Sequence, residues 1–134
     1  MALPEQADIA LAEQPPLEEA GLPYDTESVD LAKKVTASGG NYFDINPKGY
    51  VPLLELDDGT RLSQSMAIIE FLDEQHPQPP LLPGTAAERA RVRALALDIA
   101  CEIHPLNNLR VLRYLVRELG VSEDAKNAWY RHWV

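Results

Sequence analysis

The sequence is poor in cysteine, in basic side chains and in long apolar runs. Its single cysteine, Cys101, rules out an internal disulfide, a zinc site built on cysteines and a CxxC redox pair. One cysteine also fits a reducing compartment. Because Cys101 lies within an apolar helical stripe, we expect a buried core residue rather than a nucleophile.

Lysine and arginine number 12 against 21 aspartates and glutamates, so the formal net charge is -9. An acidic chain without a basic cluster is a poor candidate for nucleic acid or anionic membranes. The apolar runs fall far below the roughly 20 residues that span a bilayer, and acids and prolines occupy the N-terminal stretch where a signal peptide needs other residues. We therefore predict a cytoplasmic protein without nucleic-acid, membrane or metal partners.

Of the 134 residues, 46% are hydrophobic, enough to bury a core. The first 76 residues mix strand and helix patterns. An Asp-Gly turn between apolar runs indicates a hairpin. Met66, Ile69 and Leu72 are expected to form the buried face of the helix after it. The expected elements are an interrupted helix within 7–20, a strand over 24–31, a loop over 33–40, a helical turn over 41–46, strands over 51–56 and 61–62, and a helix over 65–74.

Prolines crowd the stretch QHPQPPLLPG, which predicts a linker over residues 77–84. Everything after it has a helical pattern. Thr85 and Glu88 form a capping box that opens a helix to about residue 103, and Pro105 predicts a break or kink. Gly120 ends the next helix and Ser122 caps the last one.

This order predicts the α+β class. We expect a partial α/β domain over residues 1–76, the linker over 77–84, and a partial all-α domain over 85–134.

The strand VPLLEL contains a proline, which sheets accept at edges, first positions and bulges. A cis Val51–Pro52 bond is a second use of proline, and it would let the backbone of Val51 pair with an extended peptide. Gln64 and Ser65 stand at a helix start, where free N–H groups favour a carboxylate. The alternatives are a plain turn at Val51–Pro52 and a simple cap at Ser65.

The run NPKGYVPLLELDDGTRLSQSMAIIEFLDEQHPQPPLLP resembles the glutathione-binding domain of glutathione transferases. Residues 19–58 are most similar to the bacterial beta class. Residues 57–134 are most similar to the zeta class of maleylacetoacetate and maleylpyruvate isomerases, above all in RARVRALALDIACEIHPLNNLRVLRYL and NAWYRHWV. The resemblance covers residues 19–134 and is strongest over 46–134.

The resemblance implies a thioredoxin-like fold with cis Pro52 and with glutathione as cofactor. Val51 would pair its backbone with the cysteinyl part of glutathione, while Gln64 and Ser65 would hold the γ-glutamyl carboxylate. The implied activity in aromatic amino-acid catabolism is cis–trans isomerisation by thiolate addition, rotation and elimination. The implied partners are a small unsaturated dicarboxylate and a second copy of the chain in a homodimer.

Three further residues are candidates for contact with glutathione or substrate in the zeta pattern: His104, Asn108 and Arg110. An arginine fork suits a carboxylate better than lysine does. The alternatives are that His104 only satisfies backbone groups at a kink and that Arg110 lies on a solvated face.

The sequence departs from the family before Tyr24, where it has no Ser, Cys, Tyr or Arg to stabilise a glutathione thiolate. We therefore expect an incomplete thioredoxin-like domain followed by a truncated helical domain. Whether the chain is an enzyme stays open. The alternatives to a zeta-like isomerase are a beta-like transferase that conjugates electrophiles and a non-catalytic remnant that binds glutathione or a partner.

Overall fold

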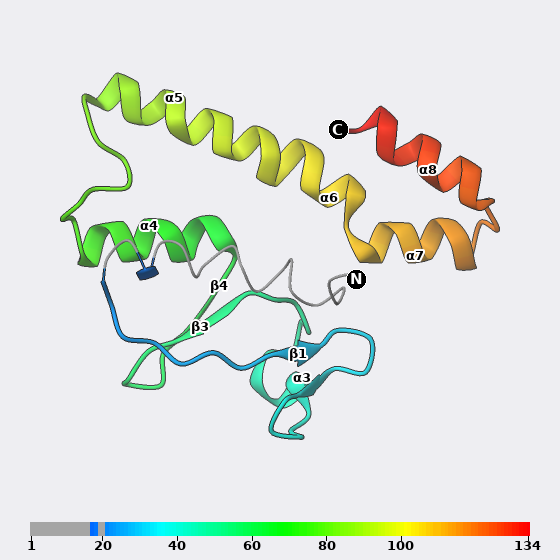
Figure 1. The fold of residues 1–134 in the computed structure, drawn as a ribbon, viewed down its shortest axis with the longest axis horizontal. Helices are drawn as coiled ribbons and strands as arrows, with labels where there is room; N and C mark the ends of the chain where they lie inside the picture. The colour runs from blue at the N-terminus through cyan, green and yellow to red at the C-terminus, as the bar shows by residue number, and fades with distance from the viewer. Residues whose placement is uncertain (1–16, 19–20) are drawn as a thin grey trace. The chain divides into compact units, whose positions relative to one another are not determined.

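The computed structural model describes residues 17, 18 and 21–134. It divides the chain into two compact units on either side of the Leu81–Leu82 bond (Figure 1). The helix that the sequence predicts within residues 7–20 lies outside the described residues except for Leu17 and Glu18, which are helical. The first unit carries α and β elements and the second is helical, which is the predicted α+β class.

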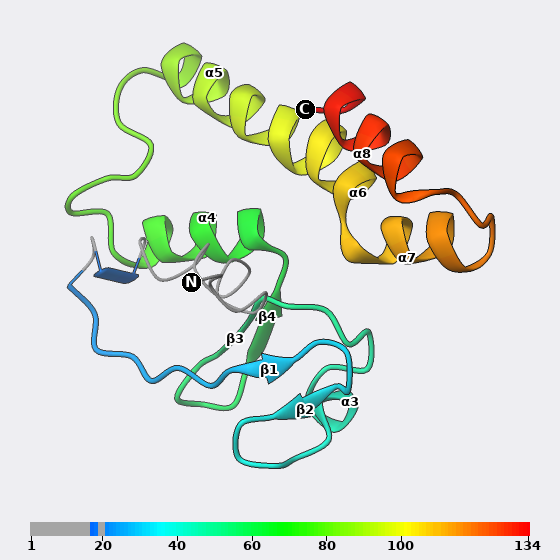
Figure 2. The same cartoon turned by 45° about the vertical axis from the view of Figure 1, so that its right-hand side comes forward.

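From residue 21 on, the first regular elements of the first unit form a short antiparallel hairpin. Strand β1 (Val29–Asp30) pairs with β2 (Val35–Thr36), as Figure 2 shows. The predicted strand over residues 24–31 is therefore wrong in extent, and β2 lies where a loop was expected. The reason is local: the Asp30 carboxylate accepts the N–H groups of Ala32 at 2.9 Å and Lys33 at 3.0 Å, which turns the chain at once.

Helix α3 (Tyr42–Ile45) confirms the predicted helical turn. Asn41 caps it, since its side chain accepts the Phe43 N–H at 3.2 Å. Pro47 follows two residues after the end of α3, where the chain has already left helical geometry.

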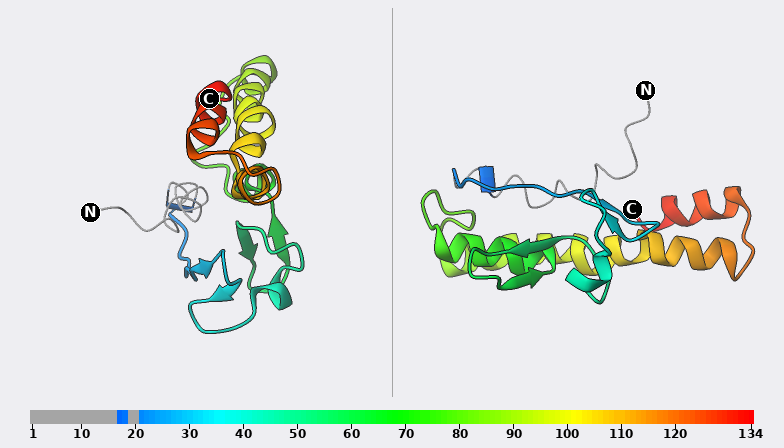
Figure 3. Two further views of the ribbon diagram at one scale, coloured as in Figure 1. Left: turned by 90° about the vertical axis from the view of Figure 1, so that its right-hand side faces the viewer. Right: turned by 90° about the horizontal axis from the view of Figure 1, so that it is seen from below.

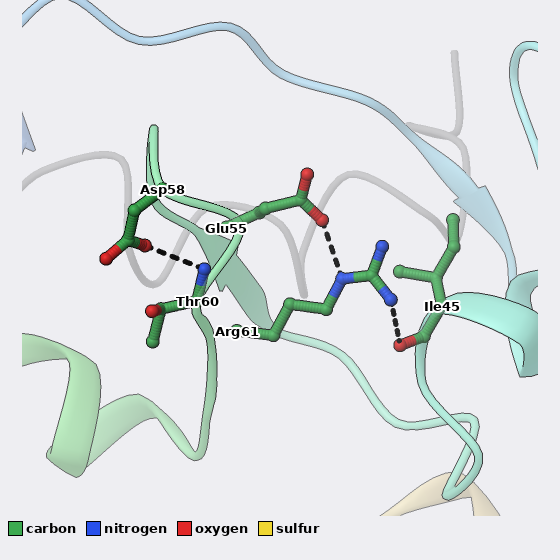
Figure 4. Close-up of polar contacts among 5 residues, drawn as sticks. All are labelled: Ile45, Glu55, Asp58, Thr60 and Arg61. Carbon is green, nitrogen blue, oxygen red and sulfur yellow. Dashed lines mark hydrogen bonds and ion pairs between the residues drawn. The ribbon is translucent and has the colours of Figure 1, made fainter.

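Strands β3 (Leu53–Glu55) and β4 (Arg61–Ser63) form the predicted hairpin around Asp58-Gly59. The Asp58 carboxylate accepts the Thr60 N–H at 2.8 Å, which holds the pKa of Asp58 below its usual range. Gly59 has a φ of 82°, a value that a residue without Cβ reaches at no steric cost. Figure 4 shows this turn.

The Arg61 side chain links the hairpin to the end of α3 by hydrogen bonds. Its Nε lies 2.6 Å from the Glu55 carboxylate on the facing strand, and its Nη1 donates to the Ile45 carbonyl at 3.1 Å (Figure 4). Both charged side chains are about half exposed. An exposed ion pair adds little stability, so the contact serves mainly to fix the register of the hairpin against α3.

Helix α4 (Ser65–Gln75) supplies the core of the first unit. Ile68 is 0% exposed and Leu72 is 4% exposed, and both pack with Leu17. The predicted buried face was wrong in part, because Met66 and Ile69 are only half-buried. The i and i+4 pair of Ile68 and Leu72 faces the hairpin instead, and the partly buried residues around this cluster are Leu22, Tyr24, Leu54, Leu62 and Phe71.

Residues 76–85 contain neither helix nor strand. The Asp73 carboxylate on α4 accepts the Leu81 N–H at 2.6 Å, which holds the first part of this segment against the first unit. We retain 1–76, 77–84 and 85–134 as the proposed division into domain, linker and domain.

The second unit opens with helix α5 (Ala86–Leu97), which continues as the π-helix η1 (Asp98–Ile103) and helix α6 (His104–Asn107). The three follow one another without a break and form one rod, labelled α5 and α6 in Figure 1. Figure 3 shows the ribbon from two further sides. The helix extends to residue 103 as predicted, and the rod ends at Asn108. Pro105 lies inside the rod, where it has no N–H to donate to the preceding turn, and the π-helical turn η1 stands directly before it. Cys101 is exposed, so the prediction of a buried core residue was wrong.

Helices α7 (Leu109–Arg117) and α8 (Glu123–His132) complete the second unit. Leu112 on α7 is buried. The Trp129 Nε1 donates to the Leu106 carbonyl at 2.9 Å. The ring centroids of Trp129 and Trp133 lie 5.8 Å apart. The two tryptophans therefore share one side of α8, as the sequence predicts, and one of them fastens α8 to α6.

The capping box at the start of α5 is confirmed and is open to a direct test. The Thr85 hydroxyl accepts the Glu88 N–H at 3.3 Å, and the Glu88 carboxylate accepts the Thr85 N–H at 2.7 Å. The Thr85 N–H and the Thr85 hydroxyl, at 2.9 Å, both donate to the Glu88 carboxylate, which lowers the pKa of Glu88. We expect Thr85→Ala to cost about 0.5–2 kcal/mol of helix stability, measured by thermal unfolding followed by circular dichroism.

The stabilisation that Glu88 gives to the folded chain depends on pH, and the direction of this dependence follows from its lowered pKa. Because its pKa is lowered in the folded chain, its stabilisation is present above the ordinary value of 4.5 and is lost as the pH falls below it. The deficit of Thr85→Ala should therefore shrink in acid. Ser122→Ala is the matched control, since Ser122 caps α8 through the Ala125 N–H and the third helical position carries alanine in place of the glutamate of the capping box. A Thr85→Ala deficit as insensitive to acid as that of Ser122→Ala would contradict the coupling.

Candidate functional site

The hairpin register brings the two predicted site segments together. Leu53 lies opposite Ser63 in the last pair of the β3–β4 ladder. The residues just beyond that pair, Pro52 on one strand and Gln64 on the other, therefore lie at the same end of the hairpin, where α4 begins. The Val51–Pro52 bond is cis, the geometry that the resemblance implies.

The backbone of Val51 is available to a ligand. No hydrogen bond within the described residues uses its N–H or C=O, and the side chain is half-buried. An extended peptide can add to such a segment as a further strand. Among the described residues, the backbone donor and acceptor directly before Pro52 thus have no partner.

Gln64 has an unusual backbone. Its φ is 78° and its ψ is 117°, a region that costs side-chain-bearing residues about 1–3 kcal/mol. Its side chain makes no cap bond, and the first helical bond of α4 runs from the Ile68 N–H to the Gln64 carbonyl at 3.0 Å. Such strain persists where the surrounding structure enforces it and clusters at ligand sites. The sequence carries no sign of this positive φ.

The start of α4 is a good anion acceptor. The N–H groups of Ser65, Met66 and Ala67 have no partner inside the helix, and the positive end of the helix dipole lies beside them. There is no acidic residue in the first turn of α4. A ligand carboxylate can therefore bind here without a competing side chain.

Two residues that the sequence did not single out lie behind Val51. Tyr42 is 3% exposed and Asn46 is 6% exposed. The Tyr42 hydroxyl and the Asn46 Nδ2 both donate to the Tyr50 carbonyl, each at 2.7 Å. The Asn-Pro-Lys-Gly stretch signals a turn that Asn46 closes, but no local pattern links Tyr42 to Tyr50.

The remaining candidates, His104, Asn108 and Arg110, belong to the second unit. His104 is exposed at the start of α6. The Asn108 side-chain oxygen caps α7 by accepting the Arg110 N–H at 2.8 Å, so within the described residues only its Nδ2 is left for a ligand. Arg110 lines an open hollow of about 310 Å³ together with Val111, Tyr114 and Leu115. All four of these residues belong to α7.

Two other kinds of site receive no support from the described part of the chain. No group of three or more His, Cys, Asp or Glu side chains there could hold a metal ion. None of the helices in residues 21–134 is both long and apolar enough to cross a bilayer.

Comparison with known proteins defines the class. The sequence profile of the glutathione S-transferase N-terminal domain matches residues 17–75. The holo structure of a maleylpyruvate isomerase, described as a bacterial zeta-class glutathione S-transferase, superposes with a TM-score of 0.82 at 41% identity, over 93% of this chain and 58% of that one. A beta-class enzyme from Sphingomonas chungbukensis gives a TM-score of 0.72 at 28% identity, over 93% and 61%. The chain belongs to the glutathione transferase superfamily.

Within the superfamily, similarity is high to zeta-class isomerases. A probable maleylacetoacetate isomerase of Vibrio cholerae is 48% identical over 118 residues, which are 84% of this chain and 53% of that protein. A maleylpyruvate isomerase of Ralstonia is 46% identical over 85% of this chain and 53% of that one. The chain thus spans about half the length of the curated relatives that it matches.

Proposed function

We propose that this chain is a glutathione-dependent cis–trans isomerase of the zeta type, acting on a small unsaturated dicarboxylate of the maleylacetoacetate or maleylpyruvate kind. The relatives with these names supply the substrate class. The observation that carries the proposal is the strained Gln64 at the start of α4, at the same end of the hairpin as the cis Val51–Pro52 bond.

The groups present fit glutathione residue by residue. The free backbone of Val51 pairs with the cysteinyl unit as an added strand, next to Pro52. The Ser65 hydroxyl, the Gln64 amide and the open N–H groups of α4 hold the γ-glutamyl carboxylate. Glutathione, when bound, supplies the thiol for the isomerisation.

The second unit offers contacts for the dicarboxylate. We assign Arg110 to a substrate carboxylate, because its planar fork can donate two parallel hydrogen bonds and apolar side chains line the same hollow. The Asn108 Nδ2 and the exposed His104 are assigned to glutathione or substrate. These three residues belong to the second unit, whereas the glutathione contacts at Val51, Gln64 and Ser65 belong to the first.

A second candidate is glutathione binding without turnover, because no side chain of the described residues is assigned to the glutathione thiolate. A thiol with a pKa of about 8.5 is only a few per cent ionised at neutral pH. A beta-like transferase that consumes glutathione is the third candidate, and the beta-class structural match supports it.

Product analysis separates the three candidates. The purified chain is incubated with a maleyl substrate and reduced glutathione, and substrate, fumaryl product and free thiol are followed together. Isomerase activity gives product with no net loss of thiol, while a conjugating transferase consumes one thiol per substrate. Glutathione binding with no turnover identifies the binding protein and rejects the isomerase.

We further propose a cytoplasmic homodimer. The support is a set of exposed apolar side chains along α5 and η1, a kind of surface that marks protein contacts: Val92, Leu95, Leu97 and Ile99. Sedimentation of the chain at twice its mass of 14.9 kDa is the expected result, and a monomer at all concentrations would reject the dimer.

A further inference from the structure

We infer that Tyr42 and Asn46 are positioning residues for glutathione: together they orient and polarise the peptide unit that presents the Val51 N–H. The inference rests on the proposed glutathione site. It explains how a loop without helix or strand holds a backbone donor ready for a ligand.

The two side chains converge on one atom. The Tyr42 hydroxyl and the Asn46 Nδ2 each lie 2.7 Å from the Tyr50 carbonyl oxygen. The Asn46 distance is at the short end for an N–H donor and the Tyr42 distance is typical of an O–H donor, and both residues are buried. A carbonyl oxygen has two lone pairs, and these two donors satisfy both.

The Tyr50 carbonyl and the Val51 N–H belong to the same peptide group. That group is planar and its N–H points opposite to its C=O. Two donors that fix the oxygen therefore also fix the direction of the Val51 N–H. This is the backbone donor that the proposed site offers to the cysteinyl unit of glutathione.

The same two bonds strengthen the donor. Hydrogen bonds accepted by an amide oxygen draw charge from its N–H, and chains of bonds in a low dielectric reinforce one another. Burial raises the pKa of Tyr42, so its hydroxyl keeps its proton throughout the working pH range. Val51 thus has a more acidic N–H than an amide whose carbonyl accepts no hydrogen bond.

The loop does not need these bonds for closure. The Gly49 N–H already donates to the Asn46 carbonyl at 2.8 Å, and the Lys48 N–H donates to the Asn46 side-chain oxygen at 3.2 Å. The Tyr42 hydroxyl adds nothing to that closed turn except its hold on the Tyr50 carbonyl. Its contribution is therefore separable from the fold of the loop.

The test replaces the hydroxyl alone. Tyr42→Phe in the full chain keeps the buried ring, and Asn46→Asp keeps the oxygen that accepts from Lys48 while losing the Nδ2 donor. Tyr24→Phe is the matched control, since its hydroxyl bonds to the exposed Glu18 at 3.0 Å, away from the loop. Each protein is titrated with reduced glutathione while its amide resonances are recorded by NMR.

Tyr42→Phe is expected to raise the glutathione dissociation constant about three- to tenfold, the worth of one hydrogen bond. In the ligand-free protein it should move the Val51 amide proton upfield, as expected for a weaker donor. Tyr24→Phe should change neither. If the Asn46→Asp protein folds, its dissociation constant and its Val51 amide shift should change in the same direction as those of Tyr42→Phe. If it does not fold, the Tyr42→Phe measurements alone decide the test.

The outcomes separate this inference from the proposed function. If the unaltered chain binds glutathione and Tyr42→Phe binds it equally, with the Val51 amide unmoved, the positioning role is rejected. A lowered unfolding midpoint with unchanged affinity assigns Tyr42 a structural role and rejects it too. If the unaltered chain does not bind glutathione, the proposed function fails, while the ligand-free Val51 shift still decides whether Tyr42 orients that peptide.

Discussion

Ile68→Ala is expected to lower the free energy of unfolding by about 2–5 kcal/mol. Ile68 is 0% exposed, and it lies on the face of α4 that packs with Leu17 and Leu72. Truncation removes the transfer free energy of the lost carbons and leaves a cavity, because neighbours on a helix and a hairpin cannot collapse fully into the gap. Chemical denaturation followed by circular dichroism measures the loss.

Ile69→Ala is the matched control, since Ile69 is the next residue of the same helix and is only half-buried. The same carbons are removed, so the difference between the two variants reports burial alone. Since native domains are stable by only about 5–15 kcal/mol, Ile68→Ala brings the first unit close to unfolding. An equal loss in both variants would show that the core is not centred on Ile68.

The double variant Gln64→Ala, Ser65→Ala is expected to abolish the stabilisation that glutathione gives the unaltered chain. A ligand that binds only the folded state adds about 2.7 kcal/mol at a hundredfold excess over its dissociation constant. The double variant loses the side-chain amide and hydroxyl next to the bound carboxylate. Thermal unfolding with increasing reduced glutathione should raise the midpoint of the unaltered chain and leave that of the variant unchanged.

Gln64→Gly sharpens this test, because it separates backbone strain from ligand contact. Glycine adopts a φ of 78° at no steric cost, so Gln64→Gly should raise the ligand-free midpoint while reducing the rise with glutathione. That combination, more stable alone and less responsive to ligand, is the mark of a strained binding residue. A midpoint of the unaltered chain that glutathione does not change would overturn the site itself.

Much of the local structure follows from the sequence. Proline, glycine and capping residues act over a few positions, so the Asp58-Gly59 hairpin turn and the Thr85–Glu88 capping box are where the sequence predicts them. The strand β1 is shorter than the predicted run over residues 24–31 because Asp30 turns the chain. Strand formation depends on a partner strand as well as on composition, and the sequence does not show how much of a run is paired.

The α+β order, the resemblance to the superfamily and the candidate site at Val51, Pro52, Gln64 and Ser65 could all be read from the amino-acid pattern. Four features are visible only in the folded chain: the positive φ of Gln64, the burial of Ile68 rather than Met66 and Ile69, the exposure of Cys101, and the convergence of Tyr42 and Asn46 on the Tyr50 carbonyl. The two groups differ in the distance along the chain over which the interactions act. Caps and turns are set by neighbours along the chain, whereas burial and convergent hydrogen bonds depend on residues that only folding brings together.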